Sequence, residues 1–238
     1  MYTYRYLIFD VDDTLLDFHA AYRDAQRSVA EKLGIEYSEK YKELSETCGW
    51  RAWNENGLNH TERKDVQDNY HLYYKNYLKN HYLYLADTLG IETNVNEVVG
   101  CYLNSISSSK RLKESDSLEV YKQLAEHYKL AVATNGIERV QKARLSEFLP
   151  YTERIYISEA IGTIKPSKAF YEYVLRDLQC DPKECLMIGD SITNDIIGAK
   201  DAGMDVCFYN PRQKSMPEGI VVDYEIRKLR QLIDILCN

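Results

Sequence analysis

The sequence predicts an α/β fold: a doubly wound parallel sheet with a second, all-helical unit inserted after its first strand. Residues 6–9 form an unbroken apolar run, as expected of a parallel strand that is covered on both faces. No further strand pattern occurs before Gly90. From residue 130 onward, short apolar runs alternate with amphipathic helical stripes, an order that right-handed crossovers convert into a parallel sheet.

The insert begins with an amphipathic helix that ends at Gly34. Its apolar residues recur at spacings of three and four: Phe18, Tyr22, Ala25, Val29 and Leu33. Further helical stretches are expected from about residue 39 to 56 and from about 61 to 80, with shorter helical material up to Gly90. We therefore predict a helical cap over residues 16–92 and an α/β domain over 1–15 and 93–238. A module inserted at the mouth of a site can act as a lid that excludes water and contacts the substrate.

The second half of the chain supplies the other elements of the α/β domain. Helices are expected over residues 94–106 and from Ser117 to 128. The predicted strands cover residues 130–134, 155–157, 185–188 and 206–209. Helical stripes separate them, at residues 140–148, 170–178 and 196–199. A last helix is expected over residues 226–236.

The composition is that of a soluble globular protein. Of the 238 residues, 45% are hydrophobic and 28% are charged, and both proportions are ordinary. The net charge of −7 and the lack of a long basic run argue against a nucleic-acid polymer as a partner. Neither a signal-peptide core nor an apolar segment of about 18 residues occurs, so we expect a cytoplasmic protein with no membrane partner. The six cysteines show no Cys-x-x-Cys spacing and are expected to be free thiols.

Two carboxylates follow the first strand. Asp10 and Asp12 are separated by one residue, which points both side chains the same way if the extended conformation continues. In an open α/β sheet the carboxyl ends of the strands form the ligand-binding edge. Two anionic groups held together in a dry site need a cation or a proton. Mg²⁺ suits this role, because it binds a few carboxylate oxygens, keeps several waters and accepts phosphate oxygens.

Further polar residues follow three later segments, and each has two interpretations when taken alone. The turn Thr134–Gly136 could hold phosphate oxygens with a hydroxyl and exposed backbone N–H groups, or it could be structural. Lys165 precedes a proline, and an isolated lysine is ordinarily solvated. Asp190 and Asp195 follow the strand at 185–188 and could each cap a helix.

Together, and in this order, these motifs resemble those of the haloacid dehalogenase (HAD) superfamily of phosphohydrolases. The pattern is strand-Asp-x-Asp, strand-Thr, Lys-Pro, and strand-Gly-Asp-x-x-x-x-Asp, and it extends over the whole chain. The resemblance implies a Rossmann-like core with a helical cap, Mg²⁺ as cofactor, and a small phosphorylated metabolite as substrate. It also implies a monomer or a homodimer.

The resemblance assigns a role to each motif residue. Asp10 would be the nucleophile that takes the phosphoryl group as an aspartyl phosphate. Asp12 would be the general acid for the leaving alcohol and then the base for water. Thr134 and Lys165 would bind phosphoryl oxygens, and Lys165 would also balance Asp10. The implied Mg²⁺ ligands are Asp10, the main-chain carbonyl of Asp12, and Asp190, with Asp195 as a ligand or acting through water.

The presence of Asp12 narrows the chemistry within the superfamily. Members that displace halide lack this second aspartate, because halide needs no acid, so a phosphate ester is favoured here. Phosphomutases with a similar helical cap keep both aspartates, and a sugar-phosphate phosphatase or phosphomutase is therefore the alternative. A catalytically inactive nucleotide-binding regulator is a distant alternative, since it would be expected to lack Asp10 or Asp12.

The cap carries a tryptophan segment that is similar to the caps of bacterial pyrimidine 5′-nucleotidases. An indole offers a stacking face for a base, and polar neighbours can bond the base edge. Residues 133–136 and 217–220 show a looser likeness to the same enzymes. We therefore expect nucleoside 5′-monophosphates, with pyrimidines preferred, as substrates. The expected substrate-binding residues are Trp50, Arg51, Trp53, Asn54, Asn135 and Gly136. The alternative for Trp50 and Trp53 is that they pack the core of the cap.

Overall fold

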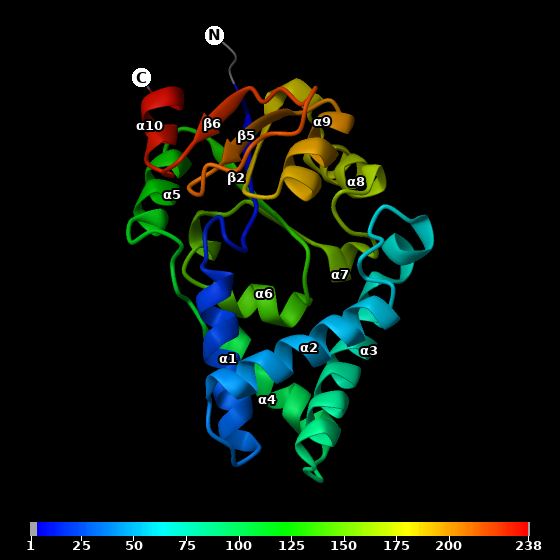
Figure 1. Cartoon of the computed structure of the whole chain (residues 1–238). Helices are drawn as coiled ribbons and strands as arrows, with labels where there is room; N and C mark the ends of the chain where they lie inside the picture. Colours follow the sequence, from blue (N-terminus) through cyan, green and yellow to red (C-terminus); the bar gives the residue numbers. More distant parts are fainter. Residues whose placement is uncertain (1–3, 238) are drawn as a thin grey trace. The chain divides into compact units, whose positions relative to one another are not determined.

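The computed structural model describes residues 4–237. The chain forms two compact units (Figure 1). The first, called the α/β unit, comprises the chain up to Phe18 and from Lys110 onward. The second, called the helical unit, comprises His19–Ser109.

Within residues 4–237, six strands form one parallel sheet in the order β3-β2-β1-β4-β5-β6. The central strand β1 pairs with β2 on one side and β4 on the other, so that Phe9 lies between Val132 and Ile188. The carboxyl ends of β1, β2 and β4 therefore meet at one edge of the sheet. This arrangement confirms the predicted fold class. The strands are β1 Tyr6–Phe9, β2 Lys129–Thr134, β3 Arg154–Ile157, β4 Cys185–Gly189, β5 Asp205–Tyr209 and β6 Tyr224–Ile226.

Helices cover both faces of this sheet. In Figure 1, α5 and α10 lie on one side of it and α8 and α9 on the other. The helical elements of the α/β unit are α5 Ser117–Ala125, α6 Glu138–Arg144, η1 Leu149–Tyr151, α7 Ser158–Ile161, α8 Lys168–Leu178, η2 Pro182–Glu184, η3 Ile192–Ile197, α9 Gly198–Asp201 and α10 Gln231–Leu236. Of these, η3 is a π-helix.

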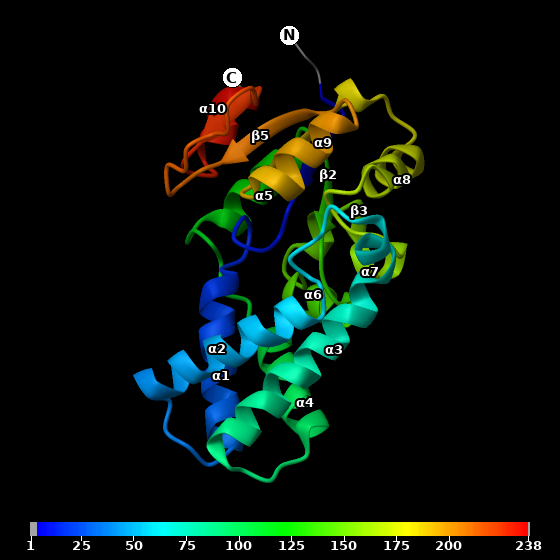
Figure 2. The ribbon, with the colours of Figure 1, turned by 45° about the vertical axis from the view of Figure 1, so that its right-hand side comes forward.

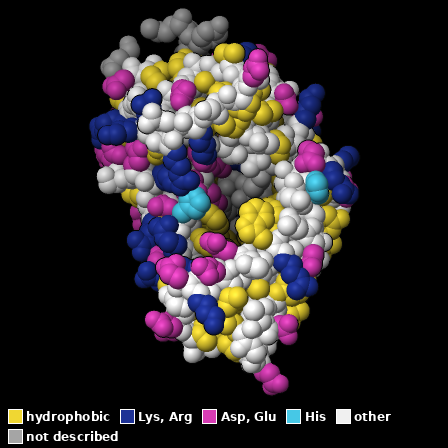
Figure 3. All heavy atoms as spheres, viewed as in Figure 1, with side chains coloured by type: hydrophobic (Ala, Val, Ile, Leu, Met, Phe, Trp, Pro, Cys, Tyr) yellow, Lys and Arg dark blue, Asp and Glu magenta, His cyan; other side chains and the backbone are white. Residues whose placement is uncertain are grey.

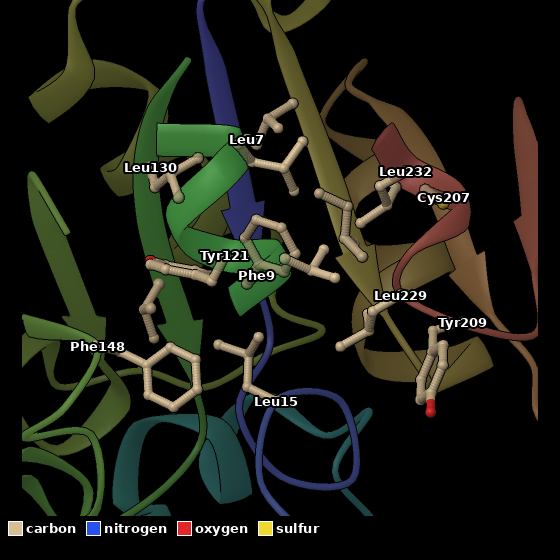
Figure 4. Close-up of a cluster of buried hydrophobic side chains, with 14 of the residues drawn as sticks. Leu7, Phe9, Leu15, Tyr121, Leu130, Phe148, Cys207, Tyr209, Leu229 and Leu232 are labelled. Carbon is tan, nitrogen blue, oxygen red and sulfur yellow. The ribbon is translucent and has the colours of Figure 1, made fainter. Parts of the chain in front are cut away.

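Alternate residues of β1 face the two layers of the core, as the period of a strand requires. Leu7 and Phe9 belong to the buried cluster that includes α5 and α10, shown in Figure 4. There the ring of Phe9 lies 5.1 Å from that of Tyr121, centre to centre. Tyr6 and Ile8 belong to the cluster on the opposite face, which includes α8. A strand covered on both faces explains the unbroken apolar run in the sequence.

The carboxyl-terminal part of the chain differs from the prediction. The sequence predicted a helix from Ile226, but Ile226 ends strand β6 and the helix α10 begins at Gln231. Strand β6 lies at the edge of the sheet and has three residues, of which Ile226 alone is buried. Because its other two residues are polar or partly exposed, β6 lacks the apolar run by which the other strands are predicted.

The helical unit contains α2 Glu39–Glu55, α3 Lys64–Leu89 and α4 Val95–Ser108, together with α1, which spans Phe18–Lys32. Helices α2 and α3 pack against one another (Figure 2). The sequence predicted a break near residue 80, but α3 continues to Leu89 and ends at Gly90, whose φ of +66° suits glycine. No helix among residues 4–237 is both long and apolar enough to cross a membrane.

The boundary between the units also differs from the prediction. We expected residues 93–109 in the α/β domain, but they belong to the helical unit. The reason is packing: Cys101 bonds the carbonyl of Ser28 on α1, and the rings of Tyr102 and Tyr82 lie 5.7 Å apart. Residues 16–18, expected in the cap, belong to the α/β unit, where Leu16 forms a β-bridge with Leu112.

Candidate active site

A cavity of about 160 Å³ lies at the carboxyl edge of the sheet in the α/β unit. Asp10 enters it directly from β1 and is only 6% exposed. Lys165 is 2% exposed, and its Nζ lies 2.7 Å from Oδ1 of Asp10 and 2.6 Å from Oδ1 of Asp195. The cavity is lined by Asp10, Asp12, Thr134, Asn135, Lys165, Asp190, Ser191, Asn194 and Asp195. The structure thus brings together the residues that the four motifs singled out.

Burial and charge together govern the nucleophile candidate and its partner. Burial raises the pKa of Asp10 well above its usual value, and the carboxylates of Asp195 and Asp12 raise it further, while Lys165 opposes the shift. Burial alone would lower the pKa of Lys165, but Asp10 and Asp195 raise it above its usual value. The lysine therefore remains charged in this site at neutral pH.

Asp10, Asp190 and Asp195 form an acidic cluster. One carboxylate oxygen from each lies within 4.8 Å of the others. Burial raises the pKa of Asp190, and Asp195 raises it further, so a cation bound in the cluster would favour the charged form of this carboxyl. Lys214 donates to Oδ2 of Asp190 at 3.2 Å. Mg²⁺ binds one or two carboxylate oxygens and keeps several waters, and the carboxylates of this cluster fit that ion.

Asp195 is held rigidly. Its Oδ1 accepts from Lys165, and its Oδ2 accepts the backbone N–H of Ser191 at 3.0 Å. It lies on the π-helix η3, a form of helix that is frequent at functional sites. A Cβ on Gly189 would lie 2.7 Å from the Cβ of Asp195, so the strand end at this position has no room for a side chain.

Asp12 contacts two residues of α6. Gln141 Nε2 donates to Oδ2 of Asp12 at 2.8 Å, and Arg144 forms an ion pair with Oδ1. Gln141 also donates to Oγ1 of Thr134 at 2.8 Å. Neither Gln141 nor Arg144 was among the predicted site residues. Both are buried on α6, and in the sequence they lie between the apolar residues by which that helix was predicted. Two long polar side chains among the apolar positions of a helix are the sequence signal that could have identified them.

The turn after β2 differs in part from the prediction. Thr134 lines the cavity as expected. The backbone N–H of Gly136, which we expected to be exposed, instead donates to Oγ of Ser158 at 3.0 Å. Asn135 donates to the carbonyl of Lys165 at 2.9 Å and accepts the N–H of Lys165 at 2.8 Å. Asn135 therefore connects two loops of the site, a role that the sequence did not indicate.

The two tryptophans line a second pocket, which lies within the helical unit. It has a volume of about 310 Å³, and its other lining residues are Tyr22, Glu46, Gly49 and Tyr77. Trp50 is 65% exposed, so the alternative that it packs the core is wrong. Trp53 is partly buried and meets the ring of Tyr77 edge-on at 5.2 Å.

The other two predicted cap residues lie outside this lining. Arg51 is exposed and bonds Glu55 on the same helix at 3.0 Å. Its guanidinium also lies 4.0 Å from the centre of the ring of Tyr84. Asn54 is exposed on the same helix.

Known proteins resemble this chain along most of its length. The family model of haloacid dehalogenase-like hydrolases matches residues 4–203. YfnB of Bacillus subtilis, described as a HAD-hydrolase, is 34% identical over 99% of this chain and 97% of its own. A crystal structure of YfnB bound to magnesium matches with a TM-score of 0.81 at 30% identity, covering 98% of both chains. The pyrimidine 5′-nucleotidase PynA of Streptococcus pneumoniae is 29% identical over 98% of this chain and 95% of its own. The glyceraldehyde 3-phosphate phosphatase of Pyrococcus furiosus is 24% identical over 97% of this chain and 92% of its own.

Proposed function

Since this chain belongs to the haloacid dehalogenase-like hydrolases, we propose that it is a Mg²⁺-dependent phosphatase of nucleoside 5′-monophosphates, with pyrimidines preferred. The observation that carries the proposal is the buried Lys165, which bonds Asp10 and Asp195 inside a cavity that also holds Asp12 and Asp190. A buried cation beside an acidic cluster is suited to a phosphoryl group approached by a carboxylate.

In this proposal Asp10 is the nucleophile. Its carboxylate attacks phosphorus, the bond to the ester oxygen breaks, and the phosphoryl group is transferred to Asp10 as an aspartyl phosphate. Lys165 and the hydroxyl of Thr134 hold phosphoryl oxygens. Mg²⁺, held by Asp10, Asp190 and the main-chain carbonyl of Asp12, would screen the negative charge between the carboxylate and the phosphoryl group. Asp195, whose two oxygens already accept from Lys165 and from the backbone N–H of Ser191, supports this site by orienting Lys165 and acts on the ion through water.

Asp12 handles the protons. It donates one to the oxygen of the leaving nucleoside as the ester bond breaks, and so becomes a carboxylate. It then takes a proton from the water that attacks the aspartyl phosphate, which releases inorganic phosphate and regenerates Asp10. The 28% exposure of its side chain leaves room for both transfers.

The pocket of the helical unit supports a nucleotide as substrate. Two indoles and the rings of Tyr22 and Tyr77 offer faces on which a base can stack. The carboxylate of Glu46 is the acidic group in this lining, and it can accept hydrogen bonds from the N–H groups of a base edge. The likeness to PynA supports a pyrimidine. We place substrate contact on Trp50 and Trp53, since Arg51 is paired with Glu55.

A sugar-phosphate phosphatase is the second candidate. The observation in its favour is the likeness to a glyceraldehyde 3-phosphate phosphatase over 97% of the chain. A small metabolite also suits the surface shown in Figure 3, where basic and acidic side chains are interspersed rather than gathered into one basic face of the kind that binds a nucleic-acid polymer.

The test is phosphate release with Mg²⁺ and with EDTA. The substrates are UMP, dUMP, dTMP, AMP, GMP, glucose 6-phosphate and glyceraldehyde 3-phosphate. We expect metal-dependent release with the pyrimidine nucleotides fastest. Faster turnover of a sugar phosphate would establish the second candidate, and no release from any of them would refute a phosphatase.

A further inference from the structure

The proposed proton donor is held by two side chains of α6 that the mechanism has not used. Arg144 is 1% exposed and pairs with Oδ1 of Asp12. Gln141 is 2% exposed and donates to Oδ2 of the same carboxylate at 2.8 Å. Each oxygen of Asp12 thus has its own donor, and a carboxylate gripped at both oxygens cannot rotate freely.

The orientation of the side-chain amide of Gln141 is fixed by its hydrogen-bond partners. Its Nε2 faces two acceptors, Oδ2 of Asp12 and Oγ1 of Thr134, both at 2.8 Å. Its Oε1 accepts from Arg144 at 3.0 Å. A reversed amide would set its oxygen against a carboxylate and its NH₂ against a guanidinium, so the neighbours dictate the orientation that is seen. Thr134 accepts this bond, and its own hydroxyl donates to the carbonyl of Asn135 at 3.4 Å, a long bond that a phosphoryl oxygen can replace.

Apart from Asp12, the guanidinium of Arg144 bonds Oε1 of Gln141 and lies 5.8 Å from the centre of the ring of Phe18. Its Nε and Nη2 are buried without a hydrogen-bond partner among the described residues. A buried arginine with two unpartnered donors lowers the stability of the fold rather than raising it. Its geometry is therefore better explained by what it does to Asp12 than by what it adds to the core.

On the basis of the proposed function, we propose that Gln141 and Arg144 are positioning residues that fix the Asp12 carboxylate beside Thr134. The distance between the carboxyl group of Asp12 and the hydroxyl of Thr134 then stays the same while the aspartyl phosphate forms and while it is hydrolysed. The proton that Asp12 donates is held on a lone pair that neither bond uses, so the leaving oxygen meets a donor that is already oriented, as general acid catalysis requires.

The close approach of Gly136 to Gln141 supports this inference independently. A Cβ at position 136 would lie 2.9 Å from Cγ of Gln141. Glycine at 136 thus makes room for the amide that links Asp12 to Thr134. Substitution of Gly136 by alanine provides a second way to displace Gln141 without changing its chemistry.

The experiment compares two leaving groups in single turnovers with excess enzyme, so that only attack on the phosphate ester is measured. UMP loses an alcohol that must be protonated, whereas 2,4-dinitrophenyl phosphate loses an anion that needs no proton. For Arg144→Met and Gln141→Leu we expect the rate with UMP to fall at least about 30-fold, since general acid catalysis contributes roughly 10²- to 10⁴-fold. The rate with the dinitrophenyl ester should fall less than about threefold by the same reasoning.

The controls separate positioning from structure. Lys142→Met changes an exposed neighbour on α6 that pairs with Glu138, and it should leave both rates unchanged. Arg144→Lys should recover part of the loss with UMP, because it keeps a donor for Asp12. Gly136→Ala should reproduce the loss caused by Gln141→Leu, with the same dependence on the leaving group. The melting temperature of Arg144→Met should equal or exceed that of the wild type.

Two failures are distinguishable. If the wild-type protein with Mg²⁺ cleaves neither ester, the proposed function is wrong. If it cleaves both, and Arg144→Met and Gln141→Leu slow both esters by the same factor, the positioning inference alone is wrong. If Arg144→Met does not fold, Gln141→Leu and Gly136→Ala test the inference in its place. The quantity compared is again the loss of rate with UMP relative to the loss of rate with 2,4-dinitrophenyl phosphate.

Discussion

The Nζ atom of Lys165 lies 2.7 Å from Oδ1 of Asp10, and both side chains are almost excluded from solvent. The same ammonium holds Asp195 at 2.6 Å. One positive charge therefore serves two buried carboxylates, with Asp190 close by. The excess of negative charge is what a metal ion would offset, and it makes the site sensitive to any change in its charges.

Asp10→Asn should abolish turnover, because an amide does not attack phosphorus. The fold should remain intact, because the substitution removes a buried carboxylate whose pKa is raised by burial. Phosphate release and a thermal melt check this. Asp201→Asn, which changes an exposed aspartate on α9, serves as the control and should keep full activity. Substantial activity in Asp10→Asn would contradict its assignment as nucleophile.

Mg²⁺ should raise the melting temperature of the wild-type protein, because an ion that binds the folded state alone stabilises it. The gain is about 2.7 kcal/mol at a concentration 100 times the dissociation constant. Asp190→Asn should remove most of this gain, since Asp190 contributes to the acidic cluster. Differential scanning fluorimetry against Mg²⁺ concentration measures the effect. An equal gain in Asp190→Asn would place the ion elsewhere.

Gly189→Ala should lower activity by at least about 100-fold and destabilise the fold by about 1 to 3 kcal/mol, as overpacking does. The added Cβ would displace Asp195, which is packed against this position, and with it the bond to Lys165. The matched control is Gly100→Ala on α4, where nothing lies within 4 Å of the added Cβ. That change should stabilise the helix by about 0.5 to 1 kcal/mol.

Trp50→Ala should raise the KM for pyrimidine nucleotides by roughly 5- to 100-fold, the range expected for loss of one stacking contact. Its melting temperature should not change, because Trp50 is 65% exposed. Trp53→Ala should change both quantities, since Trp53 also packs against Tyr77. Leu72→Ala, another exposed apolar residue of the helical unit, is the control. Equal effects of Trp50→Ala on glucose 6-phosphate and UMP would refute stacking on the base.

His81 should make the helical unit less stable in acid. Burial lowers its pKa to about 4, whereas an unfolded histidine titrates near its usual value of about 6.5. Between these values the unfolded chain binds a proton that the folded chain does not, so stability falls as the pH decreases, by up to ~3 kcal/mol. In His81→Gln the slope of melting temperature against pH should flatten between pH 6.5 and 4.5. The control, His60→Gln, changes an exposed histidine of the same unit and should keep the wild-type slope.

The sequence allowed the site to be located because its main residues follow strand ends, and apolar runs reveal strands. The parallel sheet is confirmed, and Asp10, Thr134, Lys165 and Asp190 line one cavity. Their chemical roles remain proposals. The motif pattern could not reveal that the amide of Asn135 would bond the backbone of Lys165, since this depends on how two loops distant in sequence meet.

Two misassignments have the same origin. Helix α4 was assigned to the α/β domain because its own pattern is helical in either setting, and only its contacts with α1 and α3 place it in the helical unit. Arg144 was overlooked because the rotation of α6 determines whether a polar side chain faces solvent or Asp12. Local sequence determines whether a segment forms a helix or a strand, but the elements that pack against it determine which of its faces is buried.

The paired bonds between Asn135 and the backbone of Lys165 have a consequence for how the protein opens. The side-chain amide of Asn135 takes the place of a second backbone, so that two loops are joined by a pair of hydrogen bonds. The backbone N–H of Lys165 donates in one of these bonds, so it cannot exchange until the loop that carries Asn135 has separated from it. The loops that carry Asn135 and Lys165 should therefore open together, and the amide of Lys165 should exchange slowly with deuterium although it lies outside the sheet.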